Sequence, residues 1–175
     1  SEPAITDVSI GSFSNSSGCN NENTVTYFNN LTPINAPRGQ TLSGTITAES
    51  DPFFGSNDHG VAIWVDFNGN GQFEASEQVY TDNKSGDVST HNFSFQIPQN
   101  AQANCLTRMR IEVSEDETPN AGEACESSST FEDGEMEDYQ LNIGPAVQQE
   151  NIGVVGVTNP DPEKQDLGLE DVKVQ

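Results

Sequence analysis

The sequence predicts an all-β protein: an antiparallel β-sandwich of the jelly-roll or immunoglobulin-like kind, with an extended hairpin at its C-terminal end. Two observations support this fold class. The apolar residues lie in short clusters separated by Gly, Asn and Pro, which is typical of sandwich strands and their turns. No segment keeps a helical period over the roughly ten residues that a helix would need. The 175 residues, 32% of them hydrophobic, suit one domain with a short remainder.

Eight segments are predicted as strands, because each is short, rich in β-branched or aromatic residues and bounded by turn residues. Residues 61–67 give the strongest signal. Their apolar side chains fall on both faces, as expected for a central strand that is covered on each side. The full set comprises residues 8–13, 24–28, 40–47, 61–67, 78–80, 90–97, 107–113 and 139–143.

The sandwich is expected to span residues 1–144, and residues 145–175 form a second unit. Gly144-Pro145 ends the strand pattern, and residues 152–158 and 167–174 then predict two strands around a polar turn. Such a hairpin is too small to bury a core of its own. It is therefore expected to be the truncated start of a following domain, or to add to the sheet of a neighbouring chain.

The charge of the chain restricts its partners. It has 28 acidic and 6 basic residues, a formal net charge of −22, which repels nucleic acids and anionic membranes and attracts cations. No apolar run approaches the roughly 20 residues of a membrane helix, so membrane insertion is not expected. The acidic composition, low in Lys and rich in Asn, Ser, Thr and Gly, fits a secreted or cell-surface protein, and the start at Ser1 fits a mature or excised piece.

The cysteines and histidines do not form a zinc pattern. Cys19, Cys105 and Cys125 are an odd set without a Cys-x-x-Cys spacing, so at most one internal disulfide can form. His59 and His91 are isolated in the sequence and are predicted to be surface or loop residues.

Residues 66–77 match the calcium-loop pattern D-x-[DN]-x-[DN]-G-x₅-E in full. In this pattern, oxygen atoms spaced along a curled chain converge on one cation, and a glycine at the sixth position allows the sharp turn. The predicted calcium ligands are Asp66, Asn68, Asn70, the backbone carbonyl of Gln72, Glu74 directly or through water, and Glu77 with both oxygens. The two asparagines lower the charge of the site and predict weak binding. The alternative is a metal-free Asn-Gly turn.

Three segments resemble the GEVED domain of bacterial secreted and surface proteins. They are Trp64–Asn68 with its following Gly-Gln-Phe turn, Thr107–Arg110, and Gly134–Tyr139, where Met136 replaces the usual Val. The similarity extends from about Ile5 to Ile143. It implies a β-sandwich accessory module that is joined to peptidases, glycoside hydrolases or adhesin-like repeats and has no established catalytic activity. The C-terminal hairpin likewise resembles the start of an immunoglobulin-like domain found in such proteins.

The resemblance to the family also indicates which cysteine positions are usual in it. Cys125 matches a common family position, whereas Cys105 stands where a small residue or Gly is more usual. Cys105 and Cys125 flank one hairpin and are a possible disulfide pair, and Cys19 competes for either.

Two glutamates in the last motif are predicted to be at least partly buried. Glu135 and Glu137 share strand parity with Tyr139, so they begin the same face if Tyr139 points to the core. A buried carboxylate needs a partner, which here is either a cation or the guanidinium of Arg108 or Arg110. These four residues are thus expected to form structural ion pairs or to support the calcium site.

The sequence favours a non-catalytic role. Carboxylates are abundant, but the sequence indicates no histidine that serves as a base beside a serine and no nucleophile motif. We expect a calcium-binding module for adhesion or for binding a polysaccharide or another surface protein. The aromatic candidates for stacking on a sugar are Trp64, Tyr80, Tyr27 and Phe53-Phe54. The alternative is a spacer or fibre-type subunit that assembles with a second copy or a downstream domain by strand addition through its C-terminal hairpin.

Overall fold

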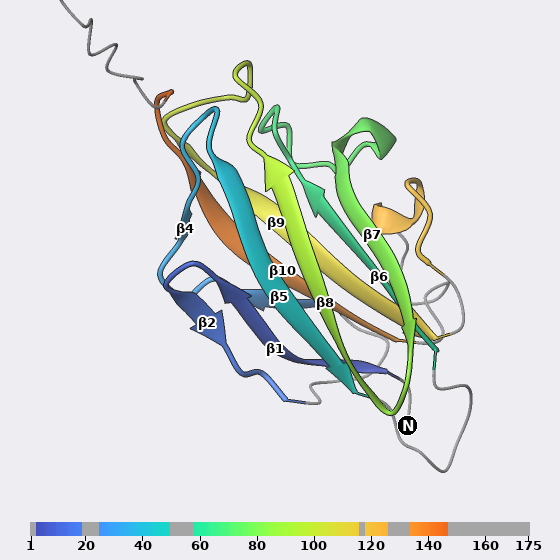
Figure 1. Cartoon of the computed structure of the whole chain (residues 1–175). Helices are drawn as coiled ribbons and strands as arrows, with labels where there is room; N and C mark the ends of the chain where they lie inside the picture. The colour runs from blue at the N-terminus through green and yellow to red at the C-terminus, as the bar shows by residue number, and fades with distance from the viewer. Residues whose placement is uncertain (1–2, 19–24, 50–57, 116–117, 126–133, 147–175) are drawn as a thin grey trace, which may run out of the picture.

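The computed structural model describes residues 3–18, 25–49, 58–115, 118–125 and 134–146, which form two β-sheets packed face to face (Figure 1). The small sheet has the order β2-β1-β5-β8, with β1 Ala4–Ile10, β2 Phe13–Asn15, β5 Thr41–Glu49 and β8 Val88–Gln96. The large sheet has the order β3-β10-β9-β6-β7, with β3 Val25–Phe28, β6 Asp58–Val65, β7 Gln78–Ser85, β9 Cys105–Glu115 and β10 Gly134–Ile143. The short strand β4, Ile34–Asn35, also pairs with β10.

Helical structure is minor in the described part of the chain. It consists of two single-turn 3₁₀ helices, η1 (Ala75–Glu77) and η2 (Glu123–Cys125). Within the described ranges, no helix has the length and apolar character needed to cross a membrane.

The predicted β-sandwich is confirmed, and each of the eight predicted strands is present. The predicted strand 8–13 is divided into β1 and β2 by a turn at Gly11, whose φ of 59° suits glycine. The expectation of purely antiparallel pairing is wrong at one edge of the large sheet, because β3 and β4 run parallel to β10. Strand patterns show which residues share a face, but they do not name the partner strand. The hairpin predicted for residues 152–174 lies outside the described residues.

Strand β6 is covered on both faces, as its sequence predicts. Its residues from Val61 to Val65 are fully buried. Val61, Ile63 and Val65 belong to the main core between the sheets, whereas Ala62 and Trp64 form a second cluster with Phe73 and Ala124. The outer face of the large sheet is therefore itself packed, and the segments that cover it hold the residues of the candidate site.

The prediction that His59 and His91 are surface or loop residues is wrong. Both are fully buried on strands that face the interior. The Oγ atom of Ser89 lies 2.7 Å from His59 Nδ1 and 2.9 Å from His91 Nε2, and His91 Nδ1 lies 3.1 Å from the Asp82 carboxylate. Because His59 and Asp82 belong to the large sheet and the other two residues to the small sheet, this chain of hydrogen bonds ties the sheets together.

The position of each proton along this series of hydrogen bonds follows from the ionised carboxylate at its Asp82 end. Hydrogen bonds from the Tyr80 hydroxyl and from His91 lower the pKa of Asp82 despite its partial burial, so the carboxylate is ionised and can only accept. His91 Nδ1 must then donate, and its Nε2 accepts the Ser89 proton. Ser89 Oγ in turn accepts a proton from His59 Nδ1. This leaves His59 Nε2 as a buried lone pair, and within the described structure that atom has no hydrogen-bond partner.

We predict that both histidines are neutral in the folded protein at pH 6.5. Burial lowers the pKa of His59, although Asp58, Asp87 and Glu115 oppose this, and burial lowers the pKa of His91 despite Asp82. A folded-state pKa below the unfolded value means that the histidines' contribution to stability is present above about pH 6.5 and is lost as the pH falls. A ¹⁵N NMR titration should show two Nδ1–H tautomers with pKa values below those in the urea-unfolded chain. An Nε2–H tautomer on either ring would contradict this proton assignment.

Candidate functional site

The candidate metal loop begins directly after β6 and is organised around the carboxylate of Asp66. This side chain is 3% exposed, and it accepts hydrogen bonds from the backbone N–H groups of Gly69 at 2.7 Å, Asn70 at 3.2 Å and Gly71 at 2.9 Å. Gly69 and Gly71 have φ angles of 69° and 82°, in the left-handed region that favours glycine. The pattern of Asp, Asn and Gly residues therefore curls the chain around a buried carboxylate.

The amide side chains of the loop continue the same curl. Asn68 Oδ1 accepts the backbone N–H of Asn70 at 2.9 Å, and Asn70 Oδ1 accepts that of Gln72 at 2.8 Å. The Nδ2 groups of both asparagines donate to the carboxylate of Glu74, at 3.0 and 2.6 Å. These contacts fix the orientation of both amides and hold Glu74 over the loop.

Glu77 closes the loop by binding its backbone. The side chain is 5% exposed, with Oε1 accepting the N–H groups of Phe67 at 2.8 Å and Asn68 at 3.3 Å, and Oε2 accepting that of Glu74 at 3.1 Å. Burial and the neighbouring Glu74 carboxylate raise the pKa of Glu77. Two adjacent carboxylates of this kind favour either a bound proton or a bound cation.

The loop fits a calcium ion in part. Asp66, Asn68 and Asn70 each place an oxygen on the curl, and an oxygen that accepts one hydrogen bond has a second lone pair for a ligand. Glu77 would have to release backbone N–H groups in order to ligate with both oxygens. Among the described residues, no three Asp, Glu, His or Cys side chains gather as a metal-binding cluster. An ion here would therefore depend on the neutral oxygens of Asn68, Asn70 and Gln72.

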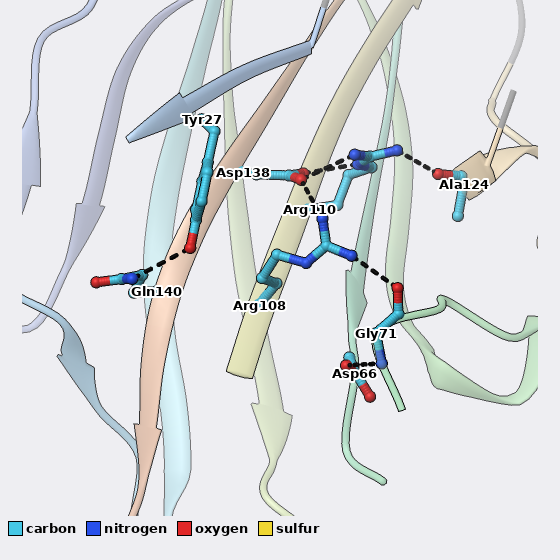
Figure 2. Close-up of polar contacts among 8 residues, drawn as sticks. All are labelled: Tyr27, Asp66, Gly71, Arg108, Arg110, Ala124, Asp138 and Gln140. Atoms are coloured by element: carbon cyan, nitrogen blue, oxygen red, sulfur yellow. Dashed lines mark hydrogen bonds and ion pairs between the residues drawn. The ribbon is translucent and has the colours of Figure 1, made fainter. Parts of the chain in front are cut away.

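A buried ion pair lies beside the loop, on the outer face of the large sheet (Figure 2). Asp138 accepts from Arg110 Nε at 2.6 Å and from Arg110 Nη2 at 2.8 Å, and Arg108 Nη1 adds a third contact at 3.3 Å. Both side chains of the main pair are buried, at 10% and 2% exposed. The register explains the pairing, because Asp138 stands directly opposite Arg110 on β9.

The same two arginines connect this ion pair to the candidate loop and to the segment that covers the sheet. Both guanidinium groups lie over the ring of Phe73, with their central carbons 5.3 and 5.1 Å from its centre. Arg108 Nη2 donates to the carbonyl of Gly71 at 2.8 Å, and Arg110 Nη1 donates to that of Ala124 at 2.5 Å (Figure 2). The loop, the motif strand β10 and η2 therefore form one connected unit.

Glu135 and Glu137 are buried as predicted, at 1% and 0% exposed, but the two arginines pair with Asp138 instead. The glutamates point to the inner face of β10, whereas the arginines and Asp138 occupy the outer face. Glu135 Oε2 accepts the backbone N–H of Ile5 at 2.8 Å, and Glu137 Oε2 accepts the hydroxyl of Tyr139 at 2.5 Å. The parity argument thus predicted their burial correctly, while the expected ion pairs of Arg108 and Arg110 with the glutamates are replaced by pairs to Asp138.

The disulfide between Cys105 and Cys125, one of the pairings that the sequence left open, is not formed. Cys105 is a free thiol that donates to the carbonyl of Gln102 at 3.1 Å. It lies at the first residue of β9, whereas the backbone of Cys125 lies in η2, which follows the far end of that strand and packs near its middle. Cys19 lies outside the described residues.

The aromatic candidates for sugar stacking differ in exposure. Trp64 is fully buried and its Nε1 donates to the carbonyl of Ala121 at 3.3 Å, so it is a core residue. Tyr80 is half-buried, and Tyr27 is 43% exposed. Phe53 and Phe54 lie outside the described residues. Of the candidates that the structure describes, Tyr27 is the most accessible.

Sequence reasoning missed two groups of residues. Asp138 was missed, although strand parity already places its side chain on the opposite face from Glu135 and Glu137. Ser89, His91 and Asp82 have the hydrogen-bonded order of a hydrolase triad, so the expectation that no histidine stands as a base beside a serine is wrong. Ser89 is only 6% exposed and its Oγ also contacts His59, so this group links the sheets and offers no accessible nucleophile.

Replacing Asp138 by Asn should lower the free energy of unfolding by about 3–5 kcal/mol, because it leaves the buried charge of Arg110 without its partner. Denaturant unfolding measures this loss. Glu49→Gln, at an exposed carboxylate on β5, is the matched control and should change stability by no more than about 0.5 kcal/mol. Equal stability of the two variants would contradict the role given to this ion pair.

Replacing Glu137 by Gln should stabilise the fold at neutral and higher pH. Burial raises the pKa of Glu137 to about 7, although hydrogen bonds from Tyr139 and Ser17 oppose the shift. The folded state then holds this proton more tightly than the unfolded state, so the associated stability is complete below about pH 4.5 and is lost as the pH rises through about 7. The gain of the variant over the native chain should grow to roughly 3 kcal/mol by about pH 8. Parallel stability curves for the two proteins between about pH 4 and about pH 8 would refute this assignment.

Comparison with known proteins agrees with the motifs. Residues 60–142, which contain all three motif segments, match the sequence model of the GEVED domain. Among solved structures, the CARDB domain of a Pyrococcus furiosus protein in complex with di-metal ions is similar at 11% identity, over 83% of this chain and 96% of that chain, with a TM-score of 0.41. No curated protein matches the chain. Residues 60–142 therefore resemble the GEVED domain, as the three motifs predicted.

Proposed function

We propose that the domain is a non-catalytic, calcium-binding module of a larger extracellular or cell-surface protein, and that it acts in adhesion or in binding a glycan. The observation that carries the calcium proposal is the curl of residues 66–72 around the buried Asp66 carboxylate, with the Asn68 and Asn70 oxygens fixed along it. A divalent cation held there would join the two ends of the loop and neutralise part of its charge.

The residues that would hold the ion are Asp66, Asn68, Asn70, the carbonyl of Gln72 and Glu74, with Glu77 as a ligand if its backbone contacts are released. Arg108 supports the same loop from the sheet through its bond to Gly71. Because Arg108 also contacts Asp138, binding at the loop would stabilise the outer face of the large sheet as well.

The binding role is supported by the family and by the charge of the chain. GEVED domains are accessory modules in extracellular proteins. A net charge of −22 excludes anionic partners on electrostatic grounds and leaves uncharged glycans and cationic or neutral protein surfaces. The alternative of a spacer that assembles by strand addition depends on residues 145–175, most of which lie outside the described residues.

Calcium should raise the melting temperature of the chain. An ion that binds only the folded state adds about 2.7 kcal/mol at about 100 times its Kd. For a domain of this size, this corresponds to a rise of about 5–10 °C. EDTA should reverse the shift and magnesium should not reproduce it, because magnesium requires a stricter octahedral site.

Two variants locate the effect. Asp66→Asn keeps one oxygen that can accept the N–H groups of Gly69 and Asn70, but it loses the second acceptor, which binds Gly71, and the charge, so it should lose most of the calcium shift. Asp87→Asn, at an exposed turn between β7 and β8, should keep the shift in full. If millimolar calcium leaves the melting temperature of the native chain unchanged, the loop is a metal-free turn and the calcium proposal fails.

A further inference from the structure

A groove lies at one side of the sandwich, where the small sheet meets the segment around β4. Its lining comes from the end of β1, the turn into β2, the residues before and within β4, and the first residues of β5. Figure 1 shows β2 and β4 along the same side of the molecule. The groove has a volume of about 870 Å³, within the range of about 300–1,000 Å³ that is usual for small-molecule sites.

The lining of this groove is uncharged. All of its residues belong to the described part of the chain, and none of them is Asp, Glu, Lys, Arg or His. On a chain with 28 acidic residues, a surface of this size without a carboxylate is a local exception. A ligand in the groove therefore contacts no fixed charge, while the field of the whole molecule disfavours an anionic ligand.

The polar groups of the lining are hydroxyls and amides. Ser14, Asn35 and Gln40 are exposed at its rim, and each amide offers both a donor and an acceptor. Phe13 and Leu31 are half-buried and Leu42 is buried, and these three residues contribute apolar side chains to the lining. The ring of Phe13 is held edge to face against Tyr139, with ring centres 5.5 Å apart. This combination of apolar side chains, one of them a fixed aromatic ring, and uncharged polar groups suits a sugar ring.

We propose that this groove binds an uncharged oligosaccharide. The inference deepens the proposed function, because it rests on the glycan-binding role and names both the surface and the ligand class. An extended peptide is the less favoured occupant. Its binding would depend on backbone pairing, and the strands at this side, β2 and β4, offer only three and two residues.

The experiment measures binding of the full chain, with calcium present, to hexasaccharides of β-1,4-linked glucose, xylose, mannose and N-acetylglucosamine by isothermal titration calorimetry. A hexamer of galacturonic acid is the anionic control. At least one neutral hexamer should bind, and the anionic hexamer should bind more weakly by about tenfold or more. Asn35→Ala and Gln40→Ala should each weaken binding by about fivefold, as expected for the loss of a hydrogen bond.

A matched control separates the groove from the rest of the surface. Asn92→Ala removes an exposed amide on the outward face of β8 and should leave binding unchanged. Both groove positions are exposed, so all three variants should keep the melting temperature of the native chain.

The possible outcomes separate this inference from the proposed function. If a neutral hexamer binds but the groove variants bind it as well as the native chain, the glycan-binding role stands and the groove inference is overturned. If no hexamer binds at about 10 mM, the groove inference and the glycan-binding role both fail, while the calcium shift tests the metal proposal separately. Tighter binding of the galacturonic acid hexamer, or of an extended peptide that competes for the groove, also overturns the inference.

Discussion

The pair between Asp138 and Arg110 is the contact on which the outer face of the large sheet depends. A guanidinium that is 10% exposed requires a compensating charge, and Asp138 supplies it with both oxygens. The remaining nitrogen of Arg110 holds the carbonyl of Ala124, and Arg108 reaches from the same carboxylate to the candidate metal loop. One carboxylate therefore orients two arginines, and the arginines in turn hold a loop and a covering segment. This gives the GEVED motif a physical role that is separate from metal binding.

The interior between the sheets contains a different set of polar groups. His59, His91, Glu135 and Glu137 are all buried there, and they form hydrogen bonds with hydroxyl, carboxylate and backbone groups. Buried groups of this kind are costly unless their hydrogen bonds are complete. The hydrogen bonds that these groups make therefore favour one alignment of the sheets, because a shifted register would break them; His59 Nε2 and Glu137 Oε1 have no hydrogen-bond partner in the described structure. The stability contributions of the two histidines and of Glu137 also depend on pH in opposite directions, because acid charges the histidines and base ionises Glu137.

The parts of the candidate site that depend on neighbouring residues in the sequence could be predicted. The loop was found because its ligand types, spacing and glycines lie within twelve consecutive residues, and its curl around Asp66 follows from those residues alone. The burial of Glu135 and Glu137 followed from two-residue periodicity. The partners of the arginines did not follow, because the choice between Asp138 and the glutamates depends on which face β9 and β10 share and on their register. The burial of the histidines was missed for a similar reason, since His59 on β6 bonds Ser89 on β8, and His91 on β8 bonds Asp82 on β7.

The sequence by itself determined the sandwich class, the positions of the strands, the double burial of β6 and the candidate calcium loop, because all of these are carried by short-range periodicity and turn residues. Only the tertiary structure decided the parallel pairing of β3 and β4 with β10, the ion pair of Asp138, the hydrogen-bonded chain from His59 to Asp82 and the uncharged groove beside β4. Each of these brings together residues that are far apart in the chain. Their contacts are set by strand order, register and the packing of two sheets, which local sequence patterns do not encode.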